Sequence, residues 1–180
     1  ITAGLVAHKM GLPIHHFIAA NNANRVVFDY INSGDYTPRP SIETIANAMD
    51  VGAPSNFTRI LDLYNHTHAE IIQVIKSVTY SDQQIRETIQ KVYNQYDYLC
   101  DPHGACAFRS LEETLKNEEI GVFLETAHPA KFTETVEEVV GKGNVEMPNK
   151  LLDFMKGEKK SIQLNSEYSS FKNYLLINSK

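Results

Sequence analysis

The chain has 180 residues, enough for one domain, and its 42% hydrophobic and 22% charged residues exclude a disordered or fibrous protein. Its formal net charge of −5 argues against nucleic-acid binding through a strongly basic face. Because no run approaches the roughly 18 apolar residues that a membrane helix needs, we expect no membrane association.

The start of the chain and its two cysteines indicate a cytoplasmic protein. Residues 1–11 lack the cationic start of a signal peptide. Because residue 1 is Ile rather than Met, we expect a processed or truncated end. Cys100 and Cys106 would point to different faces of one helix, so we expect both to be reduced.

The first part of the sequence alternates helix and strand patterns, which is typical of a parallel α/β sheet. Residues 2–10 predict a short helix with Thr2 as a possible N-cap, and residues 14–20 predict a strand. After the polar loop 21–24, a helix is expected over residues 25–31. Three more helices are expected over residues 41–49, 55–64 with Ser55 as the cap, and 68–78.

The second part predicts two capped helices, a strand and a composition change. Ser81 caps a helix reaching about residue 96, and Asp101-Pro102 opens one reaching about residue 116. Residues 120–124 predict the second clear strand, and residues 130–140 a helix. Glycines and a charged run follow from Gly141, so we expect a body over residues 1–140 and an extension packed on it over residues 141–180.

These elements leave a shortage of strands. About eight helical pieces accompany only two strands, whereas an open parallel sheet usually needs more strands to bury its helices. Either strands are missed or residues absent from this chain complete the sheet, and the missing initial Met favours the second explanation.

Two polar clusters in the first part lie at a strand end and a helix start, where open α/β folds bind ligands. The amides of residues 21–24 can donate and accept hydrogen bonds to a polar ligand, although Asn also simply favours turns. Residues 47–56 connect the end of one expected helix to the start of the next, which Ser55 caps. The N-terminus of that second helix could bind a phosphate, or the segment is a plain capped turn.

Two further clusters carry histidines. The helix dipole would keep His103 neutral in the first turn after Asp101, which suits a donor or a base, although a half-buried space-filling His is the alternative. Residues 125–132 bring together three polar groups: the Thr126 hydroxyl, the His128 imidazole and the Lys131 ammonium. They form either a binding site or a simple capped turn. We expect no metal site, because the spacings of His15, His16, His66 and His68 do not match ligand spacings.

In this order, the four clusters resemble threonine synthase of the bacterial and fungal kind. The resemblance covers the whole chain, including a tail of the family's usual kind. The matching runs are Ile1–Leu5, Gly11-Leu12-Pro13, Phe17–Asn24, Asn47–Gly52, Pro54-Ser55-Asn56, Asp101-Pro102-His103 and Thr126–Phe132.

The resemblance implies an α/β fold, part of a parallel three-layer sheet with flanking helices, similar to tryptophan synthase β and other pyridoxal-phosphate enzymes of fold type II. The family converts O-phosphohomoserine and water to threonine and phosphate, with pyridoxal phosphate as the electron sink. Its Schiff-base lysine and glycine-rich phosphate loop lie in the N-terminal half. The chain is therefore expected to be the C-terminal part, with residues 1–140 in the cofactor-binding domain, the N-terminal half as partner, and neither activity nor cofactor on its own.

The resemblance also implies roles for individual residues, none of them catalytic. Thr126 matches the hydroxyl that hydrogen-bonds the pyridine nitrogen, and a neutral partner there tempers the electron sink. Thr2 and Ala3 place the first helix N-terminus toward the cofactor phosphate. The candidates for binding substrate are Asn22, Asp50, Asn56, His103, His128 and Lys131, of which Lys131 is not the Schiff-base lysine.

Two other functions stay open. The first is a relative with altered chemistry, which either removes phosphate without further reaction or dehydrates an amino acid. The run Asn47–Gly52 argues against the dehydratase. A non-catalytic interaction module is the other alternative. An upstream lysine motif and glycine-rich loop favour the enzyme, whereas a soluble chain that binds no cofactor and has no such upstream sequence favours the module.

Overall fold

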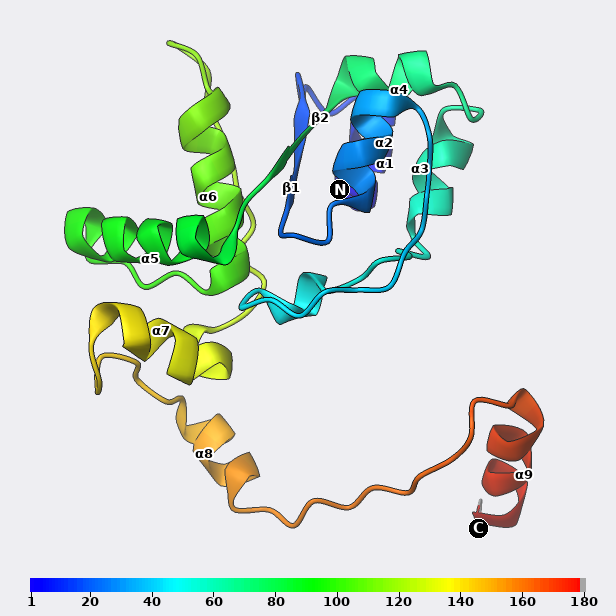
Figure 1. The fold of residues 1–180 in the computed structure, drawn as a ribbon, viewed down its shortest axis with the longest axis vertical. Coiled ribbons are helices and arrows are strands. Elements are labelled where there is room, and N and C mark those ends of the chain that lie inside the picture. The colour runs from blue at the N-terminus through cyan, green and yellow to red at the C-terminus, as the bar shows by residue number, and fades with distance from the viewer. Residues whose placement is uncertain (179–180) are drawn as a thin grey trace. The chain divides into compact units, whose positions relative to one another are not determined.

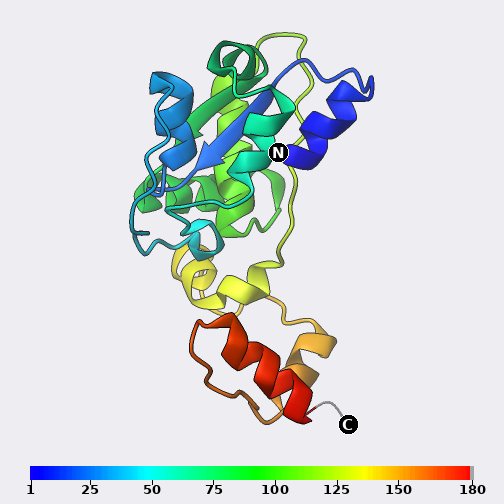
Figure 2. The same cartoon turned by 90° about the vertical axis from the view of Figure 1, so that its right-hand side faces the viewer.

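The computed structural model describes residues 1–178 and divides the chain into two compact units, residues 1–146 and 147–180 (Figures 1 and 2). The expected division between a cofactor-binding part at residues 1–140 and an extension at residues 141–180 stays a prediction. The elements of the first unit are α1 (Thr2–Lys9), β1 (Phe17–Asn21), α2 (Val26–Ser33), η1 (Asn47–Met49), α3 (Phe57–Leu63), α4 (His68–Val74), β2 (Ile75–Thr79), α5 (Asp82–Tyr96), α6 (Pro102–Thr114), η2 (Pro129–Phe132) and α7 (Thr133–Val140).

A parallel pair of strands forms the centre of the first unit. β1 and β2 pair in register from Phe17 opposite Ile75 to Asn21 opposite Thr79. Helices lie on both sides of the pair, with α1 to α4 on one side and α5 and α6 on the other (Figure 1). The expected α/β class with a parallel sheet between helical layers is therefore confirmed, and the sheet has two strands among the described residues.

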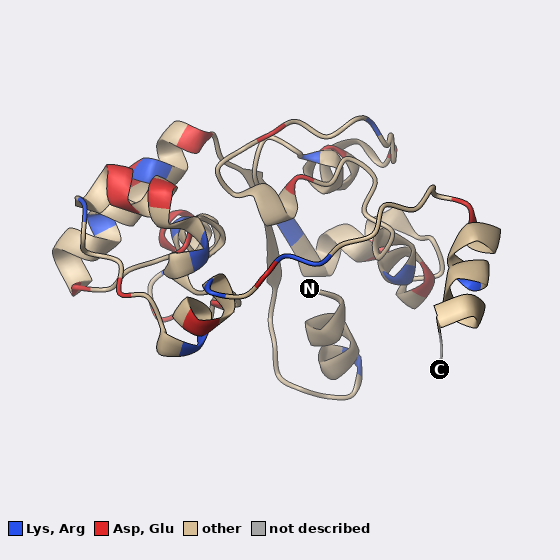
Figure 3. Ribbon diagram, turned by 90° about the horizontal axis from the view of Figure 1, so that it is seen from below, with Lys and Arg blue, Asp and Glu red and all other residues tan. Residues whose placement is uncertain are grey.

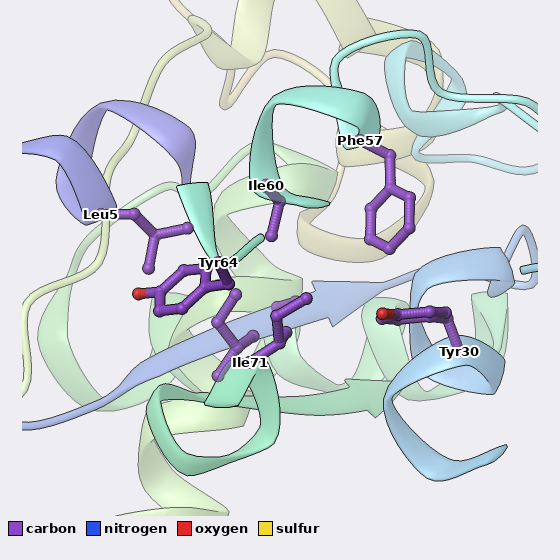
Figure 4. Packing of buried hydrophobic residues seen from close by; sticks show 8 residues of the cluster. Leu5, Tyr30, Phe57, Ile60, Tyr64 and Ile71 are labelled. Atoms are coloured by element: carbon purple, nitrogen blue, oxygen red, sulfur yellow. The ribbon is translucent and has the colours of Figure 1, made fainter. Parts of the chain in front are cut away.

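The main hydrophobic core joins the sheet to α1–α4. Leu5 of α1 and Ile71 of α4 are fully buried beside Phe57 and Ile60 of α3 (Figure 4). The ring of Tyr30 meets Phe57 edge-on, with centroids 4.8 Å apart. Each such large apolar side chain contributes about 1.5–3 kcal/mol on burial, so this cluster holds the four short helices on the sheet.

The helices on the other side have strong caps. Ser81 and Gln84 form a reciprocal capping box at the start of α5, and the Asp101 side chain accepts the His103 N–H at the start of α6. Both helix starts agree with the sequence prediction. The Ile85, Ile89 and Val92 side chains of α5 are buried.

The second strand was misplaced by the sequence analysis. Residues 75–79, expected at the end of a helix over 68–78, form β2, whereas residues 120–124 are extended but belong to no strand. The apolar run Ile71, Ile72, Val74 and Ile75 fits a helix as well as a strand, and pairing with β1 decides the outcome. The shortage of strands remains.

The helix expected over residues 41–49 is also wrong. Only the short 3-10 turn η1 forms, because the side chains of Asn24 and Asp50 accept the backbone N–H groups of Ile42 and Thr44. The loop also passes close to itself at Gly52, where a Cβ would lie 1.8 Å from the Arg39 carbonyl oxygen. That approach requires glycine at position 52.

Two expected caps are absent. Ile1 is the N-cap of α1 and makes no side-chain bond, and Thr2 is the first helical residue. Asn56 rather than Ser55 occupies the N-cap of α3, again without a side-chain bond.

The second unit contains α8 (Asn149–Met155) and α9 (Tyr168–Asn178). Neither helix contains a buried residue, and Phe154, Leu176 and Ile177 are largely exposed. No helix among residues 1–178 is long and apolar enough to cross a membrane. Lys and Arg positions are interspersed with Asp and Glu positions along the ribbon (Figure 3), and ion pairs such as Arg86 with Glu138 and Arg109 with Glu113 connect some of them.

Candidate functional site

A buried polar cluster lies where β1 ends. The Asn22 side chain has no exposed surface, and its amide nitrogen donates to Asp50 Oδ1 and to Thr44 Oγ1, both at 2.8 Å. The Thr44 backbone N–H donates to the second oxygen of Asp50 at 2.9 Å. The structure therefore brings the two predicted residues Asn22 and Asp50 into direct contact, and their polar atoms are committed to the loop.

Asn24 extends the same cluster. Its amide nitrogen donates to the Ile42 carbonyl at 2.7 Å and to Asp50 at 2.9 Å, and its amide oxygen accepts the Ile42 N–H at 2.7 Å. These bonds satisfy backbone groups that lack a regular element, so the cluster fixes the path of residues 42–50.

His103 connects this loop to α6. Its Nδ1 lies 2.7 Å from Oδ1 of the fully buried Asp101, and its Nε2 accepts the backbone N–H of Ala48 at 3.2 Å. Accepting at Nε2 requires the proton of the neutral ring on Nδ1, where it bonds Asp101. The ring also packs against Phe132, with centroids 4.9 Å apart.

Glu125 joins the same group of side chains. Its Oε1 accepts the backbone N–H of Asp101 at 3.1 Å. Burial, the dominant cause, and the neighbouring Asp101 carboxylate raise the pKa of Glu125 to about 7, although the Asp101 N–H and His103 act in the opposite direction.

Thr126 lies on the opposite side of the extended segment from Glu125. Along residues 120–126, Gly121, Phe123 and Glu125 are half-buried, whereas the alternate residues are exposed. The Phe123 ring meets Phe108 of α6 edge-on. Because side chains of an extended chain alternate, Thr126 shares its outward face with three exposed apolar side chains, those of Ile120, Val122 and Leu124.

The remaining predicted residues are spread over other surfaces. Thr2 is half-buried and Ala3 exposed in the first turn of α1, and Asn56 is exposed at the start of α3. His128 caps η2 by accepting the Ala130 N–H at 3.1 Å. The Lys131 side chain is exposed and takes part in none of the ion pairs found among residues 1–178.

Sequence reasoning missed Thr44 and Glu125, which hold two of these groups in place. Thr44 bonds Asn22 and Asp50, and Glu125 accepts the backbone N–H of Asp101 beside His103. Asn24 and Asp101 belonged to the predicted clusters, and the structure shows them supporting Asp50 and His103. Nothing local marks Glu125 as half-buried.

Other kinds of site are not apparent in the described part of the chain. Within residues 1–178, no group of three or more His, Cys, Asp or Glu side chains is placed to hold a metal ion. Cys100 and Cys106 are buried free thiols, and burial raises the pKa of each to about 12. A hollow of about 560 Å³ in the second unit contains none of the predicted site residues; its lining consists of Lys159, Lys160, Ser161, Ile162, Leu164 and Tyr174.

The sequence is similar to threonine synthases over nearly its whole length. Residues 103–175 match the family model described as "Threonine synthase, C-terminal". The threonine synthase of Haemophilus influenzae is 37% identical over 176 residues, which are 98% of this chain and 41% of that protein. The corresponding protein of Buchnera aphidicola from Schizaphis graminum is 36% identical, over 98% of this chain and 40% of its own length.

The fold leads to the same family. The crystal structure of threonine synthase from Escherichia coli superposes with a TM-score of 0.86 at 32% identity, covering 99% of this chain and 41% of that one. This chain is related to the C-terminal part of threonine synthases. The threonine synthase of Brucella melitensis, solved with pyridoxal phosphate bound, has a TM-score of 0.80 at 27% identity over 96% of this chain.

The chain spans about 40% of the length of the curated threonine synthases that it matches. The resemblance stated from its motifs is therefore confirmed, including its restriction to the C-terminal part. The likeness to solved threonine synthases also confirms the expected fold.

Proposed function

We propose that this chain is the C-terminal part of a pyridoxal-phosphate-dependent threonine synthase, a carbon–oxygen lyase of the cytoplasm that converts O-phosphohomoserine and water to threonine and phosphate. The observation that supports this most is the similarity over 98% of the chain to proteins of that name. The chain alone is inactive, because the Schiff-base lysine of the family lies in the part that these relatives have in addition.

The outward face of residues 120–126 fits the cofactor on this proposal. The Thr126 hydroxyl is exposed and makes no hydrogen bond within the described residues, so it is free to meet the pyridine nitrogen. As a neutral partner, it leaves that nitrogen unprotonated more often than a carboxylate does. Pyridoxal phosphate supplies an electron sink for the replacement chemistry.

The first turn of α1 fits the cofactor phosphate. The Ile1 N-cap makes no side-chain bond and no acidic residue lies in the first turn, so the N–H groups of Thr2 and Ala3 and the positive end of the dipole stay available. An anion placed there lowers the electrostatic energy of this end of the helix.

The substrate candidates fall into two groups on this proposal. Asn56, His128 and Lys131 are exposed and can reach a ligand, and Lys131 offers a charge to the substrate phosphate or carboxylate. Asn22 and Asp50 bond one another and the loop, and His103 bonds Asp101 and Ala48, so all three shape the surface that the substrate meets.

The test is phosphate release and threonine formation from O-phosphohomoserine with added pyridoxal phosphate. The intact protein should form both products, and the 180-residue chain alone should form neither. Phosphate released without threonine would favour a relative with altered chemistry. Neither product from the intact protein, together with no cofactor binding, would favour a non-catalytic module.

A pair of substitutions at Thr126 tests the role of its hydroxyl group. In the intact protein, Thr126→Val should lower kcat up to about tenfold, since one hydrogen bond between neutral groups is worth about 0.5–1.5 kcal/mol. Thr126→Ser keeps the hydroxyl and serves as the matched control, with activity near that of the unaltered protein. Equal rates for the Val and Ser variants would contradict the role of the hydroxyl.

A further inference from the structure

Two carboxyl groups that the proposed reaction does not use meet at the start of α6. Glu125 ends the inward face of residues 120–126, and Asp101 precedes the helix. Glu125 Oε1 accepts the Asp101 backbone N–H at 3.1 Å, and the Glu125 carboxyl group lies against Gly104 in the first turn of α6, the helix that Asp101 caps. We call Asp101 and Glu125 the carboxyl pair.

The unpaired atoms of the carboxyl pair indicate a shared proton. Asp101 Oδ2 and Glu125 Oε2 are both buried and have no hydrogen-bond partner. Two carboxylates have only acceptors, so no hydrogen bond can join them unless one is protonated. Two like charges on neighbouring carboxyl groups in a buried place are also strongly unfavourable.

The surroundings place that proton on Glu125. Asp101 Oδ1 accepts the His103 backbone N–H at 2.8 Å and lies 2.7 Å from His103 Nδ1, and both contacts stabilise a charged Asp101. Glu125 has a single backbone donor. Among the described residues, the titratable side chains that act most on Glu125 are those of Asp101 and His103. Two weak acids complete the surroundings, Tyr98 and Cys100.

Gly104 allows the contact. A Cβ on this residue would lie 1.6 Å from Glu125 Oε2, and its three nearest atoms would all belong to the Glu125 carboxyl group. The Glu125 side chain therefore rests on the first turn of α6 only because residue 104 has no side chain.

We propose that Glu125 and Asp101 share one proton and that this pair fastens residues 120–126 to the first turn of α6, which keeps Thr126 facing outward. His103 continues the link to the loop at Ala48 through its Nε2. Glu125 and Asp101 are thus positioning residues that connect the candidate cofactor contact to the loop of residues 42–50. The proposal concerns folding and protonation and holds whatever reaction the protein performs.

The proposal predicts a specific dependence of stability on pH. The pKa of Glu125 rises from its usual 4.5 to about 7 in the folded protein. Between these values the folded state binds more protons than the unfolded state, so stability falls as the pH rises from 4.5 to 7. Below pH 4.5 the group contributes no penalty, and above pH 7 the penalty is complete.

The experiment compares Glu125→Gln with the unaltered intact protein, because the Gln amide resembles a permanently protonated Glu. The thermal midpoint of the variant should exceed that of the unaltered protein only slightly at pH 5 and by clearly more at pH 8. The infrared carbonyl band of a buried protonated carboxylic acid should be present at pH 6 and lost in Glu125→Gln. Glu43→Gln changes an exposed glutamate and serves as the control, with the band and the midpoints unchanged.

A band that persists in Glu125→Gln, or a midpoint difference that is the same at pH 5 and pH 8, would overturn the shared proton. Neither readout involves phosphate release. A failure here therefore leaves the proposed reaction untouched, and an inactive intact protein leaves the carboxyl pair untouched.

A second pair of variants tests the contact between the Glu125 carboxyl group and Gly104 of α6, and it applies even if Glu125→Gln does not fold. Gly104→Ala should lower the thermal midpoint, because the added methyl group displaces the Glu125 carboxyl group. Adding Glu125→Gly removes the clash and should restore the midpoint. If the double variant is no more stable than Gly104→Ala, the carboxyl group does not lie on α6 as described.

Discussion

The Asn22 and Asp50 side chains hold the loop of residues 42–50, which has little regular secondary structure of its own. Four bonds from the Asn22, Asn24 and Thr44 groups converge on the Asp50 carboxylate, and Asn22 is fully buried. A buried acceptor that loses its donors suffers the whole desolvation cost, which makes these polar residues important for stability.

Replacing Asn22 tests this role. Asn22→Ala should lower the free energy of unfolding of the intact protein by about 2–3 kcal/mol, because it leaves Asp50 and Thr44 short of a buried donor. Asn32→Ala is the matched control, since the exposed Asn32 bonds only the Phe28 carbonyl in its own helix. Urea titration gives both values. A loss below 0.5 kcal/mol at Asn22 would contradict a structural role for the cluster.

Sequence patterns predicted the caps of the two long helices but not those of two short ones. Ser81 and Asp101 cap α5 and α6 as expected, because a cap depends on residues within one turn, whereas Thr2 and Ser55 do not cap α1 and α3. The burial of Asn22 and the partial burial of Glu125 depend on chain segments 22 or more residues away, Thr44 to Asp50 in one case and Asp101 in the other. No local pattern carries that information, so the sequence did not show which of these polar side chains are withdrawn from water.

At the scale of elements, residues 120–126 explain both the success and the error of the strand prediction. Their alternation is real, since Gly121 and Phe123 pack on α6 while Val122 and Leu124 point outward. A strand also needs a neighbour to bond, and the described residues provide none. The alternating pattern therefore predicted the extended conformation correctly. It could not predict whether a neighbouring strand pairs with these residues.

We predict that the outward face of residues 120–124 is covered in the intact protein by the part that its relatives have in addition. Val122 is 78% exposed here, so Val122→Asp should leave the thermal midpoint of the 180-residue chain within a degree or two. In the intact protein, the same change buries an unpaired charge and should lower the midpoint by several degrees. Ile162→Asp, at a residue 63% exposed in the second unit, is the comparison. Equal effects of Val122→Asp in both proteins would contradict this covering.

At the scale of the whole molecule, the chain combines one well-packed unit with one that buries almost nothing. The hydrophobic cluster and the polar cluster both belong to residues 1–146, and Val145 is the last buried residue among residues 1–178. The composition change at Gly141 predicts an extension that begins there, and this division stays a prediction.

Removing residues 147–180 tests where the stability resides. Because no residue of 147–178 is buried, the first unit should unfold at a midpoint within about 2 °C of that of the 180-residue chain, with an unchanged near-ultraviolet circular dichroism spectrum from its tyrosines. Stability follows buried apolar area, and this truncation removes chiefly exposed side chains such as Phe154 and Ile177. A fall of 10 °C or more would mean that the second unit contributes to the core of the first in solution. The control is Ile89→Ala, which empties a fully buried position in α5 and should lower the midpoint by about 4–20 °C, since such a cavity costs about 2–5 kcal/mol.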